Sequence, residues 1–209
     1  RVRAVGLNFR DVLNVLGEYP GDPGPPGGDC AGVVVASGPS AHHQVALGCA
    51  AFGFSPGALC SISRAPTMLL VPRPLVLSPD AACTLPIVWS TVHVACEAAR
   101  SSTGHVWLVH AAAGGVGLNA TEYAAWLHVC ALGSLGSRSK HQHLHMAGLG
   151  DACSVSSRDA AAFTSGLGRA VGAARLRCVL NSLSSDFTAD SFASLADGGC
   201  SAVLGKPSI

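Results

Sequence analysis

The segment HAAAGGVGLNA, from His110 to Ala120, contains three glycines and four alanines among its eleven residues. It follows an apolar run at 106–109 and precedes a segment with helical spacing at 121–127. Bare backbone between a strand and a helix lets a pyrophosphate approach the main chain, where free N–H groups at the helix start face its negative charge. A tight packing turn without a ligand is the alternative. The residues of this predicted dinucleotide site are Ala112, Ala113, Gly114, Gly115, Val116 and Gly117, which read as G-x-G-x-x-G with alanine in the first place.

The residues after the second expected strand indicate which dinucleotide would bind. An NAD site usually has Asp or Glu about 20 residues after the glycine turn, where the carboxylate accepts hydrogen bonds from the ribose 2′-OH. Here no acidic residue occurs between Glu122 and Asp151, whereas Ser137, Arg138 and Lys140 offer a hydroxyl and two cations. These groups suit a 2′-phosphate. The sequence therefore predicts NADPH as the cofactor.

The glycine turn belongs to a second part of the chain in which apolar runs alternate with helical spacing, the pattern of a doubly wound parallel sheet. Strands are expected at 106–110, 129–135, 152–157, 177–183 and 201–205. Helices are expected at 117–127, 139–148, 159–172 and 187–196.

The first part of the chain is rich in turn residues. The segment 17–29 holds five glycines and four prolines and is expected to form a long loop. Apolar runs at 30–38 and 67–74 predict short strands. The predicted fold class is therefore α/β, with a β-rich lobe at 1–79 and a nucleotide-binding lobe at 80–209. We expect these two lobes to share a cleft.

Composition and charge exclude several classes of partner. Hydrophobic residues make up 49% of the 209 residues and charged residues 12%, which is typical of a folded α/β chain. The net charge of +1 leaves no excess of cations for nucleic acid or an anionic membrane. No apolar run is expected to approach the roughly 20 residues of a membrane span, and no signal-peptide pattern opens the sequence. We expect a cytoplasmic protein.

Cysteine and histidine spacing argues against a metal centre. The nine cysteines are widely spaced without a C-x-x-C pair, which favours reduced, mostly buried thiols. His141 and His145 stand at i and i+4 of an expected helix, but no third ligand is evident. The sequence therefore predicts no metal site.

Seven segments of the chain together resemble the enoyl reductase domain of modular polyketide synthases and animal-type fatty acid synthases. They occur in that family's order from Val2 to about Lys206, and they read AVGLNFRDVLNVLGEYPGD, GGDCAGVV, TLPIVWSTVHVAC, LVHAAAGGVGL, SRSKH, SSRD and VLNSLS. The resemblance is to the zinc-free branch of the medium-chain dehydrogenases/reductases, because zinc enzymes carry a cysteine ligand where this chain has NFRD. It implies a Rossmann-type NADPH-binding lobe at 80–209 and an incomplete GroES-like substrate and catalytic lobe at 1–79.

Members of this family pass a hydride from NADPH to the β-carbon of an α,β-unsaturated acyl thioester, and a proton then reaches the α-carbon. The thioester is carried on the phosphopantetheine arm of acyl carrier protein. The resemblance therefore implies an NADPH-dependent enoyl reductase. It also implies flanking synthase domains as partners and a homodimer formed through the parent synthase.

The resemblance further implies roles for individual residues. Asn8 of LNFRD matches a position near the nicotinamide and substrate, where its amide could donate to an enolate oxygen. Tyr19 matches the tyrosine associated with proton delivery, while Lys140 and Asp159 match a lysine and an aspartate proposed as proton donor and partner. Either Tyr19 or Lys140 could deliver the proton. Asn181 of VLNSLS is assigned to the cofactor.

Each of these residues also has a structural interpretation. Tyr19 would cap the Pro/Gly loop, Asp159 would be the N-cap of a helix, and Lys140 would serve the 2′-phosphate instead of the proton. Asn8 and Arg10 could equally be structural.

Departures from the family's pattern keep two other functions open. The segment 47–53, LGCAAFG, replaces a usual Gly-Asp-Arg-Val turn, and His128 stands where glycine is common. Family strands before Val2 and after Lys206 are expected to be missing. One alternative is therefore a degenerate, non-catalytic relative that keeps the fold. The other is a quinone oxidoreductase, which shares fold and cofactor, although VLNSLS and LPIVWSTVHVAC favour the synthase enzyme.

Overall fold

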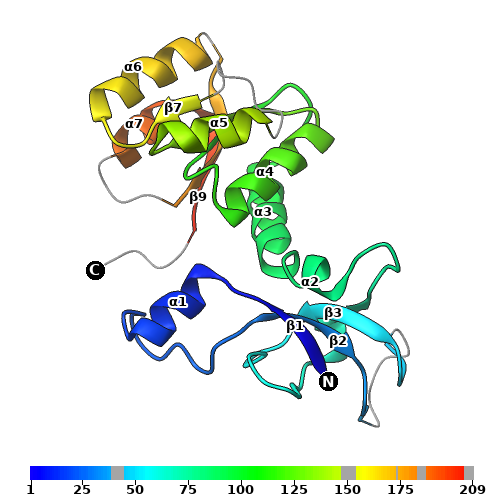
Figure 1. Ribbon diagram of the computed structural model, residues 1–209. Helices are drawn as coiled ribbons and strands as arrows, with labels where there is room; N and C mark the ends of the chain where they lie inside the picture. The colour runs from blue at the N-terminus through cyan, green and yellow to red at the C-terminus, as the bar shows by residue number, and fades with distance from the viewer. Residues whose placement is uncertain (39–44, 147–153, 173, 183–186, 205–209) are drawn as a thin grey trace. The chain divides into compact units, whose positions relative to one another are not determined.

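The computed structural model of the chain describes residues 1–38, 45–146, 154–172, 174–182 and 187–204 (Figure 1). The chain divides into two compact units, which we call unit 1 (Arg1–Val88) and unit 2 (Trp89–Ile209). The division falls inside helix α3 (Pro86–Ala99), later than the boundary predicted after residue 79. The functions predicted for the two lobes stay predictions.

Unit 2 contains a five-stranded sheet in the order β7-β6-β5-β8-β9, in which every neighbouring pair of strands is parallel. Its strands are β5 (Val106–Val109), β6 (Cys130–Leu135), β7 (Ser154–Ser156), β8 (Leu176–Asn181) and β9 (Leu195–Val203). Its further helices are α4 (Gly115–Trp126), α5 (Arg138–Met146), α6 (Ala160–Val171) and α7 (Thr188–Ala193). The predicted α/β fold with a parallel sheet is confirmed.

The last helix and strand of unit 2 have different bounds from those predicted. The helix expected over 187–196 ends at Ala193, and the strand expected from residue 201 already begins at Leu195. Leu195 pairs with Leu176 of β8 before a register shift in the ladder, so β9 pairs with the sheet earlier than the apolar run indicates.

Two apolar cores cover the two faces of this sheet. Trp107 and Val109 of β5 belong to the core that includes residues of α3, α4 and α5, whereas Leu108 between them belongs to the core that includes α6. The first core also buries Tyr123 of α4, and the second buries Phe163 of α6. Helices therefore cover both faces, as parallel sheets require.

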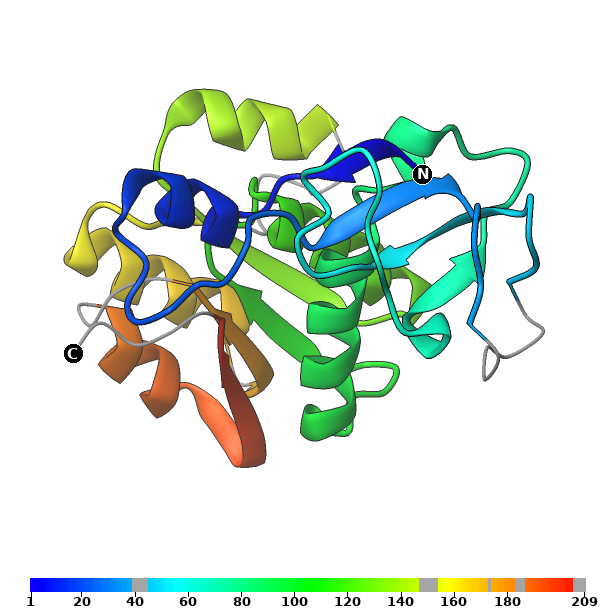
Figure 2. The ribbon, with the colours of Figure 1, turned by 90° about the horizontal axis from the view of Figure 1, so that it is seen from below.

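Unit 1 contains a four-stranded antiparallel sheet in the order β1-β2-β3-β4, and Figure 2 shows β2 between β1 and β3. Its strands are β1 (Val2–Gly6), β2 (Asp29–Val33), β3 (Ala50–Phe54) and β4 (Leu70–Pro72). Its helices are α1 (Phe9–Leu16), the 3-10 turn η1 (Thr67–Leu69) and α2 (Pro79–Ala82). The strands predicted at 30–38 and 67–74 are thus present but shorter.

Helix α1 was not predicted, and its burial is the reverse of an ordinary amphipathic helix. Its buried residue is Asp11, whereas Phe9 and Val12 are exposed. Asp11 Oδ2 accepts from the Asn8 N–H at 2.9 Å, and Oδ1 accepts from the Gly27 N–H at 2.8 Å. This carboxylate therefore ties the start of α1 to the end of the long Pro/Gly loop, which forms no helix or strand over 17–28.

The segment Pro79–Ala99 is long and apolar enough to cross a membrane, with a mean hydropathy of 1.2. The expectation that no apolar run approaches this length is therefore wrong on these two criteria. The segment comprises α2 and α3, and 33% of its most apolar window is buried inside the structure. Because core helices of folded proteins pass the same test, the cytoplasmic location stays a prediction.

Eight of the cysteines lie in the described part of the chain, and all eight are free. Cys30, Cys83, Cys96 and Cys178 are buried, so burial holds for half of them rather than for most. Burial raises the pKa of the Cys178 thiol to about 12, with smaller contributions from its neighbours, so this side chain is an inert part of the core.

Candidate functional site

The turn between β5 and α4 is tight at Gly117. A Cβ atom at this position would stand 2.5 Å from both the Cα and the carbonyl O of Ala112. Glycine therefore lets the first turn of α4 pack against the fully buried Ala112, which is the role expected of the last glycine in the fingerprint. Ala111 has a φ of 49°, in the left-handed region of backbone conformation that residues other than glycine rarely adopt.

The start of α4 presents N–H groups that precede the helix's own hydrogen bonds. Gly114 is the N-cap, no side chain caps the helix, and the Gly114 N–H donates to the Ala111 carbonyl at 2.8 Å. The first bond into the helix runs from the Leu118 N–H to the Gly114 carbonyl at 2.9 Å. The N–H groups at 115–117 therefore have the position and partial positive charge that suit an anion.

The glycine turn and Asn181 lie at the same edge of the sheet. The strand order reverses between β5 and β8, and ligands of doubly wound sheets bind outside the carboxyl ends of the strands at such a point. Asn181 is the buried last residue of β8, and its carbonyl accepts from the Leu204 N–H at 2.7 Å. These two predicted cofactor segments are thus brought to one place.

The segment after β6 is exposed and polar, as predicted for a 2′-phosphate site. Ser137, Arg138 and Lys140 are all exposed around the start of α5, where the Lys140 N–H donates to the Ser137 carbonyl at 3.1 Å. Sequence reasoning missed Arg158, which follows β7. A Cβ atom on Gly136 would stand 2.9 Å from Arg158 Nε, so this third cation lies against the same segment.

Asp159 has a structural contact as the N-cap of α6. Its Oδ1 accepts from the Ala162 N–H at 2.9 Å. Lys140 follows β6 and Asp159 follows the adjacent β7, so both stand at the same sheet edge. The catalytic roles of Lys140 and Asp159 stay predictions.

In unit 1, the Asn8 side chain is oriented by a buried aspartate that sequence reasoning missed. Asn8 Nδ2 donates to Asp29 Oδ2 at 2.9 Å, and the Ile87 N–H donates to Asp29 Oδ1 at 2.9 Å. Burial raises the pKa of Asp29 to about 6; the hydrogen bonds from Asn8 and Ile87 lower it, and the charge of Asp11 raises it further. The side-chain amide of Asn8 has two hydrogens, and one of them is thus donated to Asp29 within unit 1.

Tyr19 is half-buried in the Pro/Gly loop of unit 1. The Arg10 guanidinium carbon lies 5.6 Å from the centroid of the Tyr19 ring, which is a cation–π contact. Arg10 also donates to the Pro23 carbonyl. Arg10 therefore holds together the loop that carries Tyr19.

The helix with the paired histidines also has a structural contact. His141 Nδ1 and Ser154 Oγ are 2.9 Å apart, which links α5 to β7. The side chain of His145 lies outside the described residues. Among the residues that the structure describes, no three His, Cys, Asp or Glu side chains gather as a metal site would require.

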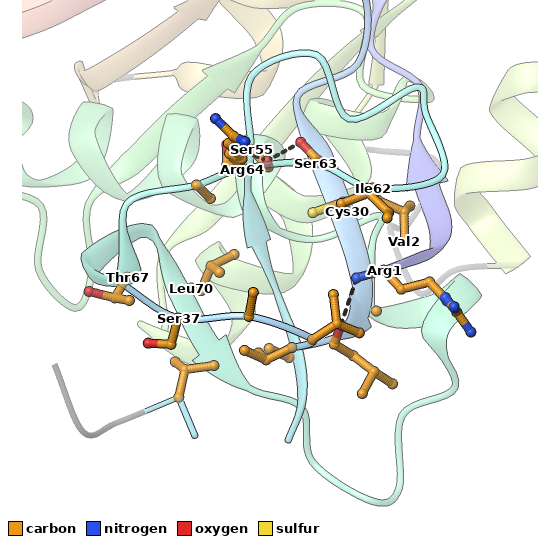
Figure 3. Close-up of a pocket in the computed structure, with 18 of the residues that line it drawn as sticks. Arg1, Val2, Cys30, Ser37, Ser55, Ile62, Ser63, Arg64, Thr67 and Leu70 are labelled. Atoms are coloured by element: carbon orange, nitrogen blue, oxygen red, sulfur yellow. Dashed lines mark hydrogen bonds between the residues drawn. The ribbon is translucent and has the colours of Figure 1, made fainter. Parts of the chain in front are cut away.

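A cavity of about 570 Å³ lies in unit 1, and none of the residues predicted for the site is among those that line it (Figure 3). It runs along β2 beside Arg1, and most of its lining is aliphatic. Its buried hydroxyl, Ser55, is hydrogen-bonded to Ser63 and to the Arg64 carbonyl. The cavity therefore lacks the convergent polar groups of an active site.

The chain is similar to polyketide synthases over its whole length. It is 37% identical over 209 residues to the pikromycin polyketide synthase component PikAII of Streptomyces venezuelae, covering 100% of this chain and 6% of that protein. It is 36% identical over 217 residues to a phenolphthiocerol/phthiocerol polyketide synthase of Mycobacterium tuberculosis, covering 100% and 10%. The chain thus spans a tenth or less of these relatives. No protein-family model matches it.

The chain is also similar in fold to solved structures. The crystal structure of CurK enoyl reductase superposes with a TM-score of 0.88 and 30% identity, over 100% of this chain and 65% of that one. A mycobacterial protein solved in complex with NADPH superposes with a TM-score of 0.86 and 26% identity, over 98% and 64%. By sequence the chain is similar to modular polyketide synthases, and by fold it is similar to enoyl reductases of the medium-chain dehydrogenase/reductase fold.

Proposed function

We propose that the chain is an oxidoreductase that uses NADPH to reduce the α,β-double bond of an enoyl thioester carried on acyl carrier protein. The observation that carries this proposal is the glycine turn between β5 and α4, in a chain similar to polyketide synthases over its whole length. The likeness to CurK enoyl reductase supports the reductase class.

The residues at the carboxyl edge of the unit 2 sheet fit NADPH. In the proposal, the N–H groups at 115–117 bind the pyrophosphate, and the closeness of Gly117 to Ala112 leaves the backbone bare for it. Arg138 and Lys140 bind the 2′-phosphate. When bound, NADPH supplies the hydride that adds to the β-carbon of the substrate.

The residues of unit 1 stabilise the charge that this addition creates. Hydride addition at the β-carbon puts negative charge on the thioester oxygen, so an N–H donor near that oxygen lowers the barrier. In the proposal, Asn8 donates its second amide hydrogen to this oxygen, because its first is held by Asp29. We assign unit 1 to the substrate and unit 2 to the cofactor.

The final step delivers one proton to the α-carbon, and Tyr19 and Lys140 are the two candidate donors. Tyr19→Phe removes only the phenol hydroxyl. If Tyr19 is the donor, the variant slows turnover or changes the α-carbon configuration of a methyl-branched product. If Lys140 is the donor, with Asp159 as its partner, Tyr19→Phe leaves both unchanged, and Lys140→Met slows turnover even when NADPH is saturating.

The proposed partners of this chain are inferred from the polyketide synthases to which it is similar. Both polyketide synthases named above are many times longer than this chain, which supports flanking synthase domains in the parent protein. We therefore propose an acyl carrier protein as the partner that brings the substrate, a homodimer formed through the parent synthase, and a cytoplasmic location.

Quinone reduction is the second candidate function. It is favoured by the superposition on a quinone oxidoreductase from Thermus thermophilus, with a TM-score of 0.74 and 27% identity over 96% of this chain and 62% of that one. The superposition on CurK enoyl reductase is closer, with a TM-score of 0.88. The enoyl thioester is therefore the preferred substrate class.

The test offers both substrates to the same protein. Crotonyl-pantetheine and a benzoquinone are each incubated with the chain and NADPH, and oxidation of NADPH is followed together with the product by mass spectrometry. We expect saturated butyryl-pantetheine and little quinone turnover. Quinone turnover without thioester reduction would overturn the enoyl thioester proposal.

A further inference from the structure

His110 is a buried polar residue at the end of β5, directly before the glycine turn. Its side chain is 2% exposed, and both ring nitrogens have a hydroxyl partner. Nδ1 lies 2.9 Å from Oγ of Ser134 in β6, and Nε2 lies 3.0 Å from Oγ of Ser191 in α7. The imidazole therefore bridges β6 and α7, which are distant from each other in sequence.

The hydroxyl partners fix where the imidazole proton sits. Ser191 has one hydroxyl hydrogen, which it donates to the Phe187 carbonyl at 2.6 Å. Its oxygen must then accept from Nε2–H of His110, which leaves Nδ1 as the acceptor for the Ser134 hydroxyl. The result is a directed series of hydrogen bonds from Ser134 through His110 and Ser191 to the Phe187 carbonyl, in which each hydrogen has an acceptor.

This series of hydrogen bonds requires a neutral imidazole, and burial of the ring keeps it neutral. Burial lowers the pKa of His110 to about 4, so the ring carries no charge at physiological pH. The ring stacks on Phe163 with the centroids 5.7 Å apart. A neutral imidazole has one donor and one acceptor at opposite sides of a flat ring, which is the combination that these two hydroxyls need.

The backbone of His110 joins the same elements. Its N–H donates to the Leu180 carbonyl at 3.0 Å, and its carbonyl accepts from Ser182 Oγ at 3.2 Å, both at the end of β8. Two residues later, the Ala112 N–H donates to the Ser134 carbonyl at 3.2 Å. Backbone hydrogen bonds thus hold the start of the glycine turn to β6 and β8, and the bond from the His110 ring to Ser191 holds it to α7.

We propose that His110 is a positioning residue of the cofactor site. It holds the glycine turn in register with the end of β6, which leads to the 2′-phosphate segment, and with the end of β8 and α7, which adjoin Asn181. This inference rests on the proposed NADPH-dependent function. It adds that one side chain aligns the adenosine half of the site, at the end of β6, with the end of β8, to which the proposal assigns the nicotinamide half.

The two hydrogen bonds of the His110 ring, to Ser134 and to Ser191, lead to different halves of the site. Ser134 lies two residues before Gly136, beside the segment assigned to the 2′-phosphate. Ser191 fastens α7, which follows β8 and Asn181. Loss of the hydrogen bond between His110 and Ser134 should therefore weaken the binding of 2′,5′-ADP, which has only the adenosine half, as well as that of NADPH. Loss of the hydrogen bond between His110 and Ser191 should weaken the binding of NADPH alone, because only NADPH has the nicotinamide.

The test measures the affinities of NADPH and 2′,5′-ADP by calorimetry for the parent chain and three variants. His110→Phe keeps the stacking on Phe163 and removes both ring bonds, so we expect NADPH affinity to fall about ten-fold or more. Ser134→Ala should weaken both ligands. Ser191→Ala should weaken NADPH and leave 2′,5′-ADP unchanged.

The control is Leu167→Ala in the α6 core, where the side chain is 2% exposed. It lowers the melting temperature without touching these hydrogen bonds, so it should leave both affinities unchanged. If the parent binds NADPH and the two serine variants bind both ligands as the parent does, His110 is only a core residue and the inference is overturned. If the parent binds no NADPH, the proposed function falls and the inference falls with it.

Discussion

The two units of the chain bury their apolar side chains to very different extents. Unit 2 has two cores that bury large residues such as Trp107 and Phe163. The one apolar cluster found in the described part of unit 1 buries only Ala31, Ala82 and Cys83. Most of the exposed large hydrophobic side chains also lie in unit 1, and they include Leu7, Phe9, Met68, Leu75 and Val76.

The buried carboxylates of the described residues lie in unit 1, whereas the polar side chains that unit 2 buries are uncharged: His110, Ser134, Asn181 and Ser191. Asp11 and Asp29 are buried carboxylates, and each accepts hydrogen bonds from two segments of unit 1. The stability of unit 2 should therefore depend mainly on cavities in its cores, whereas the stability of unit 1 should depend mainly on the charge state of its carboxylates. Because Trp89, Trp107 and Trp126 are the three tryptophans of the chain, intrinsic fluorescence reports unit 2.

The largest expected effect contrasts one phenylalanine in each unit. Phe163→Ala removes a fully buried ring in unit 2 and should lower the free energy of unfolding by about 3–5 kcal/mol. Phe9→Ala removes a ring that is 74% exposed in unit 1 and should change it by less than about 0.5 kcal/mol. Urea unfolding followed by tryptophan fluorescence for Phe163→Ala and by circular dichroism for both variants measures the difference. Equal losses would break the comparison.

The next effect is a pH dependence confined to unit 1. The pKa of Asp29 is raised by burial from 3.8 to about 6, so between these values the folded state binds more protons than the unfolded state. Stability from this group is therefore present below pH 4 and is lost as the pH rises through 6, by about 3 kcal/mol in all.

Hydrogen exchange of the β1, β2 and β3 amides, read by mass spectrometry, measures this loss. Asp29→Asn should remove the slope between pH 4 and 6. Glu18→Gln replaces an exposed carboxylate of the same unit and should keep the slope. A slope that persists in Asp29→Asn would assign the pH dependence to another group.

A smaller effect is expected at the glycine turn of unit 2. Gly117→Ala puts a Cβ atom 2.5 Å from the backbone of Ala112, which should cost about 1–3 kcal/mol and abolish cofactor binding. Gly168→Ala in α6 meets no atom within 4 Å and should stabilise the helix by up to about 1 kcal/mol. Thermal unfolding of the two variants beside the parent decides, and a neutral Gly117→Ala would disprove the close packing.

The smallest expected effect separates capping from catalysis at Asp159. Asp159→Ala removes the N-cap of α6 and should cost about 1 kcal/mol, whereas Asp159→Asn keeps a capping oxygen and should cost little. Turnover of crotonyl-pantetheine is measured on both. If Asp159→Asn keeps the stability but loses turnover, Asp159 acts in the reaction; if both are kept, it is a cap alone.

The difference between the units also explains what could be predicted from the sequence. The central strands β5 and β8 of unit 2 are buried on both faces, so they read as short apolar runs, and the glycine turn stands at the junction of β5 with a helix. Helix α1 escaped prediction because its buried residue is an aspartate and its Phe9 is exposed, which reverses the usual pattern.

The residues that orient the site were missed for a different reason. Asp29 contacts Asn8 and Ile87, and His110 contacts Ser134 and Ser191, and each of these pairs joins segments that are distant in sequence. No local spacing encodes such contacts. Arg158 escaped notice because it follows β7, and only the pairing of β6 with β7 brings it to Gly136.

The measurement that tests the central claim most directly is calorimetric binding of NADPH and NADH to the parent chain, to Arg138→Ala and to Lys140→Ala. A charge-assisted bond to a phosphate contributes about 1.5–3 kcal/mol. The parent should therefore prefer NADPH, and each variant should bind NADPH about ten-fold or more weakly while binding NADH almost as the parent does. Equal affinity of the parent for the two cofactors, or a parallel loss of both cofactors in the variants, would contradict the account.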